Sequence, residues 1–364
     1  MKNLGFGLMR LPLLDGSDQK NFDKKQVCEM VDSFLAQGFT YFDTAYMYHD
    51  GYSERLVKEV LVQRHKRDSY LLATKLPTMM LKEVGDMERI FNEQLDRTGA
   101  EYFDYYLLHC LNKDNYATCN RLGAFDFVMQ KKADGIVKKI GFSYHDNAEL
   151  LDEILTAHPE MEFVQLQINY LDWEDNGVQS RKCYEVARKH GKDIIVMEPV
   201  KGGKLADLPK SAEDLLKEKE PGLSAASWAV RFAASCEGVI MVLSGMSNMQ
   251  QLTDNTSYMS DFRQLTDEEK KLCFKAADII NSAGSVPCTA CRYCVEGCPM
   301  NIPIPEYFSL FNGERNDEAK AKYAELAGKG GKASDCIACG QCEGHCPQHI
   351  KIIERLKDVA AALE

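Results

Sequence analysis

Eight short runs rich in β-branched and aromatic residues constrain the fold of this chain more than any other feature. They lie at residues 3–9, 39–45, 70–76, 103–109, 137–143, 163–169, 193–199 and 238–245. Longer amphipathic segments separate them, at roughly the thirty-residue spacing of a strand–helix–strand crossover. Eight such units within about 250 residues predict an α/β chain that closes into a (β/α)8 barrel, the TIM-barrel architecture, rather than an open sheet.

The segments between the runs have the pattern of the barrel's outer helices. Residues 24–38 are an example, because an apolar stripe with helical periodicity is followed by a glycine stop at Gly38. The stripe consists of Val27, Met30, Val31, Phe34 and Leu35. We therefore expect a helix of the outer ring here.

The barrel pattern ends well before the chain does. The chain divides into three predicted segments: a barrel at 1–262, a connecting helix at 263–284 and a small helical, cysteine-rich module at 285–364. Thr266 and Glu269 form a capping box that predicts the start of the connecting helix, and Gly284 predicts its end. Within the module, residues 306–332 suggest a helical insertion that closes with a flexible glycine-rich loop at 328–332.

The module contains two cysteine runs with the same spacing, and a proline follows each run. The first run is Cys288, Cys291, Cys294 and Cys298, and the second is Cys336, Cys339, Cys342 and Cys346. This spacing is typical of bacterial ferredoxins, in which three cysteines of a run bind one [4Fe-4S] cluster and the fourth binds the other. We therefore expect two clusters, one bound by Cys288, Cys291, Cys294 and Cys346, the other by Cys336, Cys339, Cys342 and Cys298.

Other roles for these cysteines fit the spacing less well. Tetrahedral zinc sites also use paired Cys-x2-Cys units, but three cysteines at two-residue intervals before a Cys-Pro suit a cube better. Disulfides are disfavoured by the reducing compartment that the rest of the chain predicts. Two roles for the clusters stay open, because they can relay single electrons or simply hold the module folded.

Charge and hydropathy exclude several classes of partner. The chain has 364 residues, a formal net charge of -11 and a sequence pI near 5.4, whereas a nucleic-acid-binding protein needs a basic patch. Glycine, arginine and proline interrupt the first sixteen residues, which therefore lack the apolar region of a signal peptide. No stretch approaches the ~18 apolar residues of a membrane span. We predict a cytoplasmic protein without membrane or nucleic-acid partners, and the sequence leaves its oligomeric state open.

Charged side chains stand where three successive runs end. Asp43, Lys75 and His109 close the second, third and fourth runs. Chemistry in a (β/α)8 barrel belongs at the carboxyl ends of the strands. A buried charge is costly unless it is paired, so we expect these side chains to form one mutually paired cluster.

The stretches "FDTAYMY", "ATKLP" and "LLH" resemble the signature of aldo-keto reductases, and the resemblance extends through most of the first 255 residues. Barrels of this family with a ferredoxin-like carboxyl-terminal module form a recognisable subgroup. The resemblance implies a catalytic tetrad of Asp43, Tyr48, Lys75 and His109. An ammonium beside a phenol should lower the phenol's pKa, so Tyr48 would be the general acid, polarised by Lys75. Asp43 would hold the lysine, and His109 would orient a substrate carbonyl.

The same resemblance implies a nicotinamide site with several departures. It assigns the cofactor to Ser143, Gln165, Asn169, Met197, Ser244, Gly245, Ser247, Gln251 and Asn255. Met197 replaces the aromatic residue that stacks on the nicotinamide ring, and Tyr144 replaces an asparagine. No arginine or lysine stands in residues 243–255, where the family binds the adenosine 2′-phosphate. NAD(H) and NADP(H) both stay open, and FMN is a third candidate cofactor.

We therefore expect an oxidoreductase that reduces a small carbonyl compound or oxidises an alcohol, while its clusters exchange single electrons with an external carrier. A flavin would adapt the paired electrons of a nicotinamide to a one-electron cluster. The alternative is an electron-transfer or structural iron-sulfur protein in which the barrel is a scaffold.

Three further residues allow either a functional or a structural interpretation. His145 and Asp146 could contact the substrate, or they could belong to a helix cap formed by Asp146 or Asn147. Trp173 could line the substrate pocket, or it could pack against the barrel.

Overall fold

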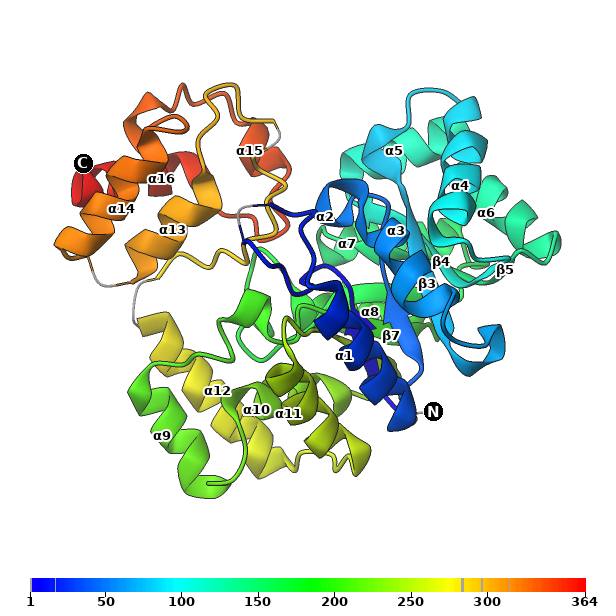
Figure 1. Ribbon diagram of the computed structural model, residues 1–364, viewed down its shortest axis with the longest axis horizontal. Helices are drawn as coiled ribbons and strands as arrows, with labels where there is room; N and C mark the ends of the chain where they lie inside the picture. Colours follow the sequence, from blue (N-terminus) through cyan, green and yellow to red (C-terminus); the bar gives the residue numbers. More distant parts are fainter. Residues whose placement is uncertain (1, 17, 283–284, 296, 314) are drawn as a thin grey trace. The chain divides into compact units, whose positions relative to one another are not determined.

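Eight parallel strands, one from each predicted run, close into a barrel in chain order (Figure 1). The computed structural model describes residues 2–16, 18–282, 285–295, 297–313 and 315–364. The strands are β1 (Leu4–Gly7), β2 (Tyr41–Asp43), β3 (Leu71–Pro77), β4 (Phe103–Leu111), β5 (Val137–Tyr144), β6 (Phe163–Gln167), β7 (Asp193–Met197) and β8 (Val239–Gly245). Pairing of β1 with β8 closes the barrel, so the predicted architecture is confirmed.

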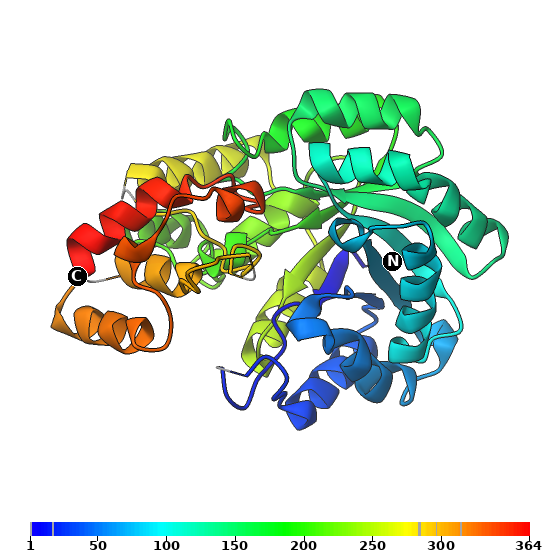
Figure 2. The same ribbon diagram turned by 90° about the horizontal axis from the view of Figure 1, so that it is seen from above.

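The helices within residues 24–199 and 222–260 lie around the outside of the barrel (Figure 2). The helices of the first part are α1 (Lys24–Ala36), α2 (Tyr48–Gly51), α3 (Ser53–Val57), α4 (Gly85–Thr98), α5 (Lys113–Leu122), α6 (Ala124–Ala133), α7 (Ala148–Ala157), α8 (Ser180–Lys189), α9 (Lys210–Lys219), α10 (Ala225–Ala234) and α11 (Met249–Ser260). Those that follow are α12 (Asp267–Ser282), α13 (Ile304–Asn312), α14 (Asp317–Ala327), α15 (Gln341–Gly344) and α16 (Ile352–Leu363). Single turns are η1 (Lys58–Val62), η2 (Arg67–Ser69), η3 (Thr78–Met80), η4 (Lys201–Gly203) and η5 (Ala333–Asp335).

Helix α1 forms where the sequence predicts it. The Asp23 side chain caps it by accepting a hydrogen bond from the backbone N–H of Gln26 at 3.0 Å. Four of the five predicted stripe residues are buried, and Leu35 is half-buried. Gly38 has a φ of +80°, which lets the chain leave the helix in the left-handed region.

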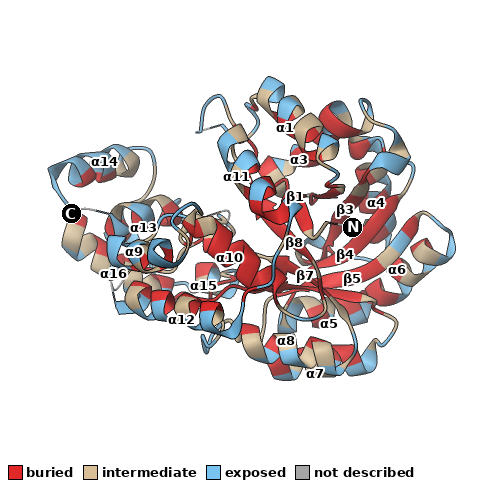
Figure 3. Cartoon of the chain, turned by 90° about the horizontal axis from the view of Figure 1, so that it is seen from below, coloured by how far each residue is buried: buried red, intermediate tan, exposed pale blue. Residues whose placement is uncertain are grey.

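The barrel is filled by side chains and is not a channel. One buried cluster consists of Tyr41, Ala73, Tyr105, Leu107, Phe163, Ile195, Met241 and Leu243, from six of the strands. Two glycines make room for it. A Cβ on Gly141 would lie 2.4 Å from the carbonyl oxygen of Phe163, and one on Gly5 would lie 2.7 Å from Leu243 Cδ2. Figure 3 shows the strands buried and the outward faces of the surrounding helices exposed.

Backbone packing divides the chain into two compact units. The first unit comprises Met1–Pro199 and Gly222–Cys273, and the second comprises Val200–Pro221 and Phe274–Glu364. The second unit includes the segment after β7, because that segment packs with the cysteine-rich part of the chain. Within the second unit, Lys204 Nζ donates a hydrogen bond to Ser285 Oγ at 2.6 Å.

Helix α12 contains residues of both units, and its start is the predicted capping box. The backbone N–H of Glu269 donates to Thr266 Oγ1 at 3.3 Å, and the N–H of Thr266 donates to Glu269 Oε2 at 2.8 Å. The predicted end at Gly284 lies outside the described residues. None of the described helices combines the length and the apolar character of a membrane span.

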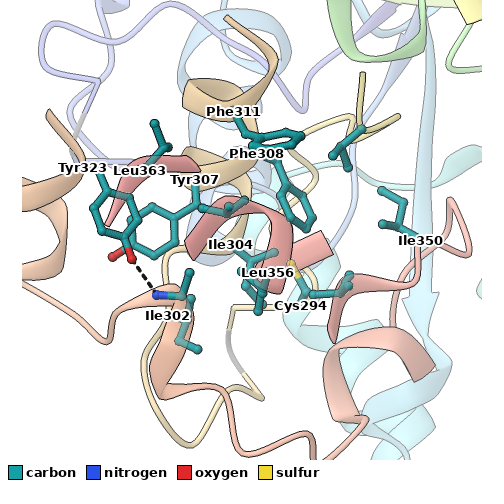
Figure 4. Packing of buried hydrophobic residues seen from close by; sticks show 14 of the residues in the cluster. Cys294, Ile302, Ile304, Tyr307, Phe308, Phe311, Tyr323, Ile350, Leu356 and Leu363 are labelled. Atoms are coloured by element: carbon teal, nitrogen blue, oxygen red, sulfur yellow. Dashed lines mark hydrogen bonds between the residues drawn. The ribbon is translucent and has the colours of Figure 1, made fainter. Parts of the chain in front are cut away.

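The second unit has its own hydrophobic core, built from α13, α14 and α16 (Figure 4). The rings of Tyr307 and Tyr323 lie 4.4 Å apart, and the Tyr323 hydroxyl accepts a hydrogen bond from the N–H of Ala333 at 2.8 Å. The loop at 328–332, expected to be flexible, is pinned instead. A Cβ on Gly331 would lie 2.3 Å from a backbone oxygen of residue 300, and the Gly331 carbonyl accepts from the Tyr307 hydroxyl at 2.8 Å. Glycine at position 331 therefore allows the backbone of this loop to lie close to the backbone of residue 300.

Candidate active site and metal cavities

The interior face of the barrel turns from apolar to polar at the carboxyl ends of the strands. Side chains of a strand alternate between its two faces, so a residue two positions after an interior one is also interior. Tyr41, Ala73 and Leu107 belong to the interior cluster. The residues two positions further on are Asp43, Lys75 and His109. The register of the strands thus brings three of the predicted catalytic residues to one end of the barrel.

Lys75 is the centre of this group. Its Nζ donates hydrogen bonds to Asp43 Oδ1 at 2.7 Å, to the Thr44 carbonyl at 2.8 Å and to the Tyr48 hydroxyl at 3.3 Å. The side chains of Lys75 and Asp43 are only 1% and 3% exposed. The ammonium therefore has a carboxylate on one side and the phenol of α2 on the other, and its donors are fully used.

Burial and pairing shift the pKa values of this ion pair in opposite directions. Burial raises the pKa of Asp43, and the Lys75 charge and hydrogen bond oppose that rise. Burial lowers the pKa of Lys75, which Asp43 and Glu54 oppose. The expected lowering of the Tyr48 pKa is not seen. Burial, followed by the charges of Asp43 and Glu198, raises the pKa of the phenol well above its ordinary value. Tyr48 is therefore protonated at neutral pH.

His109 faces Tyr48 across the site, with ring centroids 6.1 Å apart. Burial, Lys75 and His145 hold the pKa of His109 well below its usual range, so the imidazole is neutral and has one N–H to donate. Its Nδ1 atom is buried and has no hydrogen-bond partner within the described part of the chain. His145, which contributes to the lowered pKa of His109, therefore lies near it, and its contact with a substrate stays a prediction.

Ser143 and Gln165 are neighbours in the register of β5 and β6, and both are buried. Ser143 Oγ accepts a hydrogen bond from the backbone N–H of Cys110 at 2.7 Å. Gln165 Oε1 is buried without a partner among the described residues. A buried acceptor of this kind costs free energy unless a ligand satisfies it. The pair fits the carboxamide of a nicotinamide, which offers an N–H2 donor and a carbonyl acceptor.

Asn169 has its hydrogen bonds within the chain. Its Nδ2 donates to Asp172 Oδ2 at 2.7 Å and to the Glu198 carbonyl at 3.0 Å, and its Oδ1 accepts from the N–H groups of Leu171 and Asp172. All four hydrogen-bonding positions of the amide are filled, which favours a structural role for Asn169, and its contact with a cofactor stays a prediction. Met197 ends β7 and is half-buried.

The polar residues after β8 mostly hold the strand to α11. Asn255 Nδ2 donates to Ser244 Oγ at 3.2 Å, and Asn255 Oδ1 accepts from the Tyr258 hydroxyl. Gln251 Oε1 accepts from the N–H of Ser247 at 2.7 Å. These contacts give Ser244, Ser247, Gln251 and Asn255 structural roles, and their predicted contact with a cofactor stays a prediction.

Arg10, which no sequence motif assigned to the site, supplies a cation at the mouth of the barrel. It lies after β1, and its Cδ would be 3.3 Å from a Cβ on Gly245 at the end of β8. It forms an ion pair of 3.7 Å with Glu198, which follows β7 and has a φ of 53°. The Arg10 charge also opposes the rise in the Tyr48 pKa. Its position after the first strand could have suggested a place at the mouth of the barrel. Its contact with β8 could not be predicted, because that contact depends on barrel closure.

Asp146 and Trp173, for which the sequence left two interpretations open, have contacts within the chain. Asn147 caps α7 by accepting from the N–H of Leu150 at 3.0 Å, and Asp146 accepts from the N–H of Lys113 at 2.9 Å. Trp173 packs edge-on against Phe232, with centroids 5.5 Å apart. These contacts favour the structural reading for Asp146, Asn147 and Trp173.

Four thiols from both cysteine runs line one cavity of the second unit, which we call the first cluster cavity. They belong to Cys288, Cys291, Cys294 and Cys346, and the cavity encloses about 310 Å³, open solvent included. Burial raises the pKa of the Cys294 thiol, and the other three cysteines raise it further. The remaining lining is largely apolar, with Arg292 paired to Glu306. Soft thiol donors in apolar surroundings fit an iron-sulfur cluster.

The other four thiols line a second cluster cavity of about 320 Å³. They belong to Cys298, Cys336, Cys339 and Cys342. Burial raises the pKa of Cys342 to about 11, with Glu343, Cys336 and Cys298 adding to it. No three His, Cys, Asp or Glu side chains in the described ranges gather around a single ion point. The thiols instead surround two spaces, and each set combines three cysteines of one run with the last cysteine of the other.

Comparison with known proteins agrees with both parts of the chain. A model of the aldo/keto reductase family matches residues 3–278, and a model of a 4Fe-4S dicluster domain matches residues 287–350. The uncharacterized oxidoreductase YqkF of Bacillus subtilis (strain 168) is 21% identical over 282 residues, which are 68% of this chain and 87% of that protein.

Solved structures show the same barrel. The holo form of the aldo-keto reductase AKR11C1 from Bacillus halodurans has a TM-score of 0.60 at 23% identity, and covers 75% of this chain and 91% of that one. An aldo-keto reductase from Klebsiella pneumoniae in complex with NADPH has a TM-score of 0.57 at 18% identity, over 76% and 90% of the two chains. With a family model over residues 3–278 and the closed barrel, the chain belongs to the aldo/keto reductase family of oxidoreductases and carries a 4Fe-4S dicluster domain after its barrel.

Proposed function

We propose that the mouth of the barrel interconverts a small carbonyl compound and its alcohol, with Tyr48 as the general acid and base. The observation that carries this proposal is the buried Lys75 ammonium, which binds the Asp43 carboxylate and the Tyr48 hydroxyl together. A cation beside a phenol stabilises the phenolate that forms when the phenol gives up its proton. The arrangement can therefore move one proton at a fixed atom, Tyr48 Oη.

Each residue of the tetrad has one task in the reduction. Tyr48 is protonated beforehand, and it donates its proton to the carbonyl oxygen. Lys75 lies 3.3 Å from the resulting phenolate and stabilises it, while Asp43 keeps the lysine charged and in place. Neutral His109 donates a hydrogen bond to the same carbonyl oxygen and orients the substrate. A bound NADH or NADPH supplies a hydride to the carbonyl carbon, so the substrate gains two electrons and two hydrogens overall.

The cofactor part of the proposal rests on Gln165, Ser143 and Arg10. The unpartnered Gln165 Oε1 would accept from the nicotinamide carboxamide, with Ser143 beside it. Phosphates often bind between the ends of strands 7 and 8 in such barrels, and Arg10 contacts both ends through Glu198 and Gly245. We assign Arg10 to the cofactor phosphates. The Klebsiella relative is described with NADPH, and both NADH and NADPH are to be tested here.

In the second unit, we propose that the two cluster cavities each bind one [4Fe-4S] cluster through their four thiolates. Such clusters would exchange single electrons with an external carrier. No observation in the structure favours FMN over a nicotinamide, so FMN enters only as an added component of the test.

The barrel site is tested by replacing one hydroxyl. We expect Tyr48→Phe to lower kcat for aldehyde reduction by about 10²–10⁴-fold, because the proton donor is lost, while NAD(P)H binding and iron content stay unchanged. Tyr46→Phe is the matched control, since the Tyr46 hydroxyl donates to Glu93 instead. If Tyr48→Phe kept the wild-type rate, or if no carbonyl in a broad panel were reduced, the barrel would be a scaffold for an electron-transfer or structural iron-sulfur protein.

The cluster part is tested by anaerobic titration of reconstituted protein with NADH and NADPH, without and with FMN. Bleaching of the cluster absorbance would show that electrons pass between nicotinamide and clusters, and a requirement for FMN would identify the adapter. Unchanged absorbance during rapid aldehyde reduction would contradict the relay and leave the clusters a structural role.

A further inference from the structure

Lys201 is a buried cation of the second unit that the proposed hydride chemistry does not use. It is only 3% exposed, although it lies on the loop after β7. Its Nζ donates a hydrogen bond to Gln348 Oε1 at 3.0 Å. Gln348 lines the first cluster cavity and follows Cys346 by two residues. The ammonium is therefore one amide group away from the wall of this cavity.

The loop that carries Lys201 is held tightly against the first cysteine run. Lys201 has a φ of 46° and Gly202 a φ of 64°, so two successive residues are in the left-handed region. A Cβ on Gly202 would lie 2.6 Å from Thr289 Cα, which only glycine tolerates. Thr289 stands between two of the cysteines and lines the same cavity. An unfavourable backbone that is kept in place indicates that the surroundings fix the position of the lysine.

Lys201 places its charge beside the first cluster cavity. Its hydrogen-bond partner Gln348 lines the first cluster cavity together with Cys346. Thr289, against which the Lys201 loop packs, lines the same cavity. One-electron reduction of a cluster adds a negative charge without a proton. A fixed cation nearby stabilises the reduced form, and this raises the reduction potential.

The second cluster cavity offers a different environment. The described residues that line it are cysteines, apolar residues and a glycine, with no lysine or arginine among them. Its Cys339 is exposed, and the neighbouring Ile337 is 61% exposed. The same sequence spacing therefore gives two sites that differ in both charge and exposure.

We propose that Lys201 is a positioning residue that sets the order of the two cluster potentials, making the cluster bound by Cys288, Cys291, Cys294 and Cys346 the easier one to reduce. This inference rests on the proposed cluster ligation and goes beyond it. An electron that an external carrier gave to the exposed second cluster would then pass to the first, so that the second cluster would lose one electron and the first would gain it.

The test is a redox titration of the full-length, reconstituted protein with dithionite, followed by electron paramagnetic resonance and visible absorbance. We expect Lys201→Met to lower the equilibrium constant for reduction of one cluster about tenfold, which is ~59 mV for one electron, and to leave the other cluster unchanged. Lys201→Arg should keep the wild-type reduction potential of that cluster.

Lys210→Met is the matched control, because it removes a lysine of α9 that is 84% exposed and pairs with Asp214. Cys339→Ser assigns the signals, since it removes a ligand of the second cluster only.

A second variant keeps the test decisive if Lys201→Met loads iron poorly. Gln348→Glu retains an acceptor for Lys201 and adds a negative charge at the first cluster cavity, so the same potential should fall. Unchanged potentials in iron-replete Lys201→Met and Gln348→Glu would overturn the inference while the proposed function stands. Equal shifts of both clusters would also overturn it. A wild-type protein that binds no clusters would overturn the proposed ligation and this inference with it.

Discussion

The mouth of the barrel and the two cluster cavities are both buried sites, yet they are built in opposite ways. At the barrel mouth, charged groups find partners within the chain: Lys75 binds Asp43, and Arg10 pairs with Glu198. In the second unit, the thiols line cavities, and in our proposal bonds to iron take the place of internal hydrogen bonds. The barrel site is therefore preorganised by the fold, whereas the cavities depend on what they bind.

The hydrophobic cores around the two kinds of site also differ in size. The barrel encloses a large core between strands and helices, as Figure 3 shows. The second unit has one core cluster of modest size, and several of its cysteines pack against that core. A small domain rarely gains enough stability from its core alone and often needs a metal. We infer that cluster binding and folding are coupled in the second unit and uncoupled in the barrel.

The largest expected effect follows from removing iron. Chelation under reducing conditions should abolish the amide protection of residues 285–364, because metal-binding free energy is folding free energy in such a module. The strands of the barrel should keep their protection. Hydrogen exchange followed by mass spectrometry, compared between chelated and reconstituted protein, measures both at once. Equal protection of the module in the two samples would break the comparison.

The next effect concerns the buried ion pair of the barrel. Lys75→Met leaves the Asp43 carboxylate buried without its partner, and should lower the free energy of unfolding by about 3–5 kcal/mol. The double variant with Asp43→Asn removes the charge as well and should recover much of the loss. Urea unfolding followed by tryptophan fluorescence reports on the first unit alone, because Trp173 and Trp228 both belong to it. Equal losses in the single and double variants would contradict the pairing argument.

The barrel and the placement of its charged residues could be predicted because both follow from periodicity. Strand-like runs at regular spacing give the closed sheet, and alternation along a strand gives the shared face of Asp43, Lys75 and His109. The spacing of the cysteine runs likewise predicted which cysteines line which cavity, and their role as ligands stays a proposal.

Features that depend on three-dimensional neighbours could not be predicted. Tyr48 was expected to have a lowered pKa because Lys75 is near, but burial and the charges of Asp43 and Glu198 raise its pKa in the structure. Arg10 reaches the site only because β1 pairs with β8. The role of Gly331 depends on backbone contact with a distant residue, so its sequence resembled an ordinary flexible loop.

A smaller effect is expected at the rim of the barrel. Arg10→Met should raise KM for NAD(P)H by about 10–100-fold with little change in kcat, because a charge-assisted hydrogen bond contributes about 1.5–3 kcal/mol to binding. Arg64→Met is the matched control, since Arg64 pairs with Asp32 on α1. Steady-state kinetics with a fixed aldehyde measure both constants. A fall in kcat at unchanged KM would place Arg10 in the chemical step instead.

The smallest expected effect is an acid sensitivity of the first unit. His49 follows Tyr48, its Nε2 accepts a hydrogen bond from the N–H of Leu11 at 3.2 Å, and burial lowers its pKa to about 4. The unfolded chain takes up this proton near pH 6.5 and the folded chain does not, so stability falls as the pH drops from about 6.5 toward 4. One histidine contributes at most about 1.4 kcal/mol per pH unit to the slope of the unfolding free energy against pH.

His49→Asn keeps an acceptor for the N–H of Leu11 and should remove this slope, as measured by urea unfolding at several pH values. His190→Asn, at the end of α8, should leave the slope unchanged. An unchanged slope in His49→Asn would show that the acid sensitivity of the barrel comes from other groups.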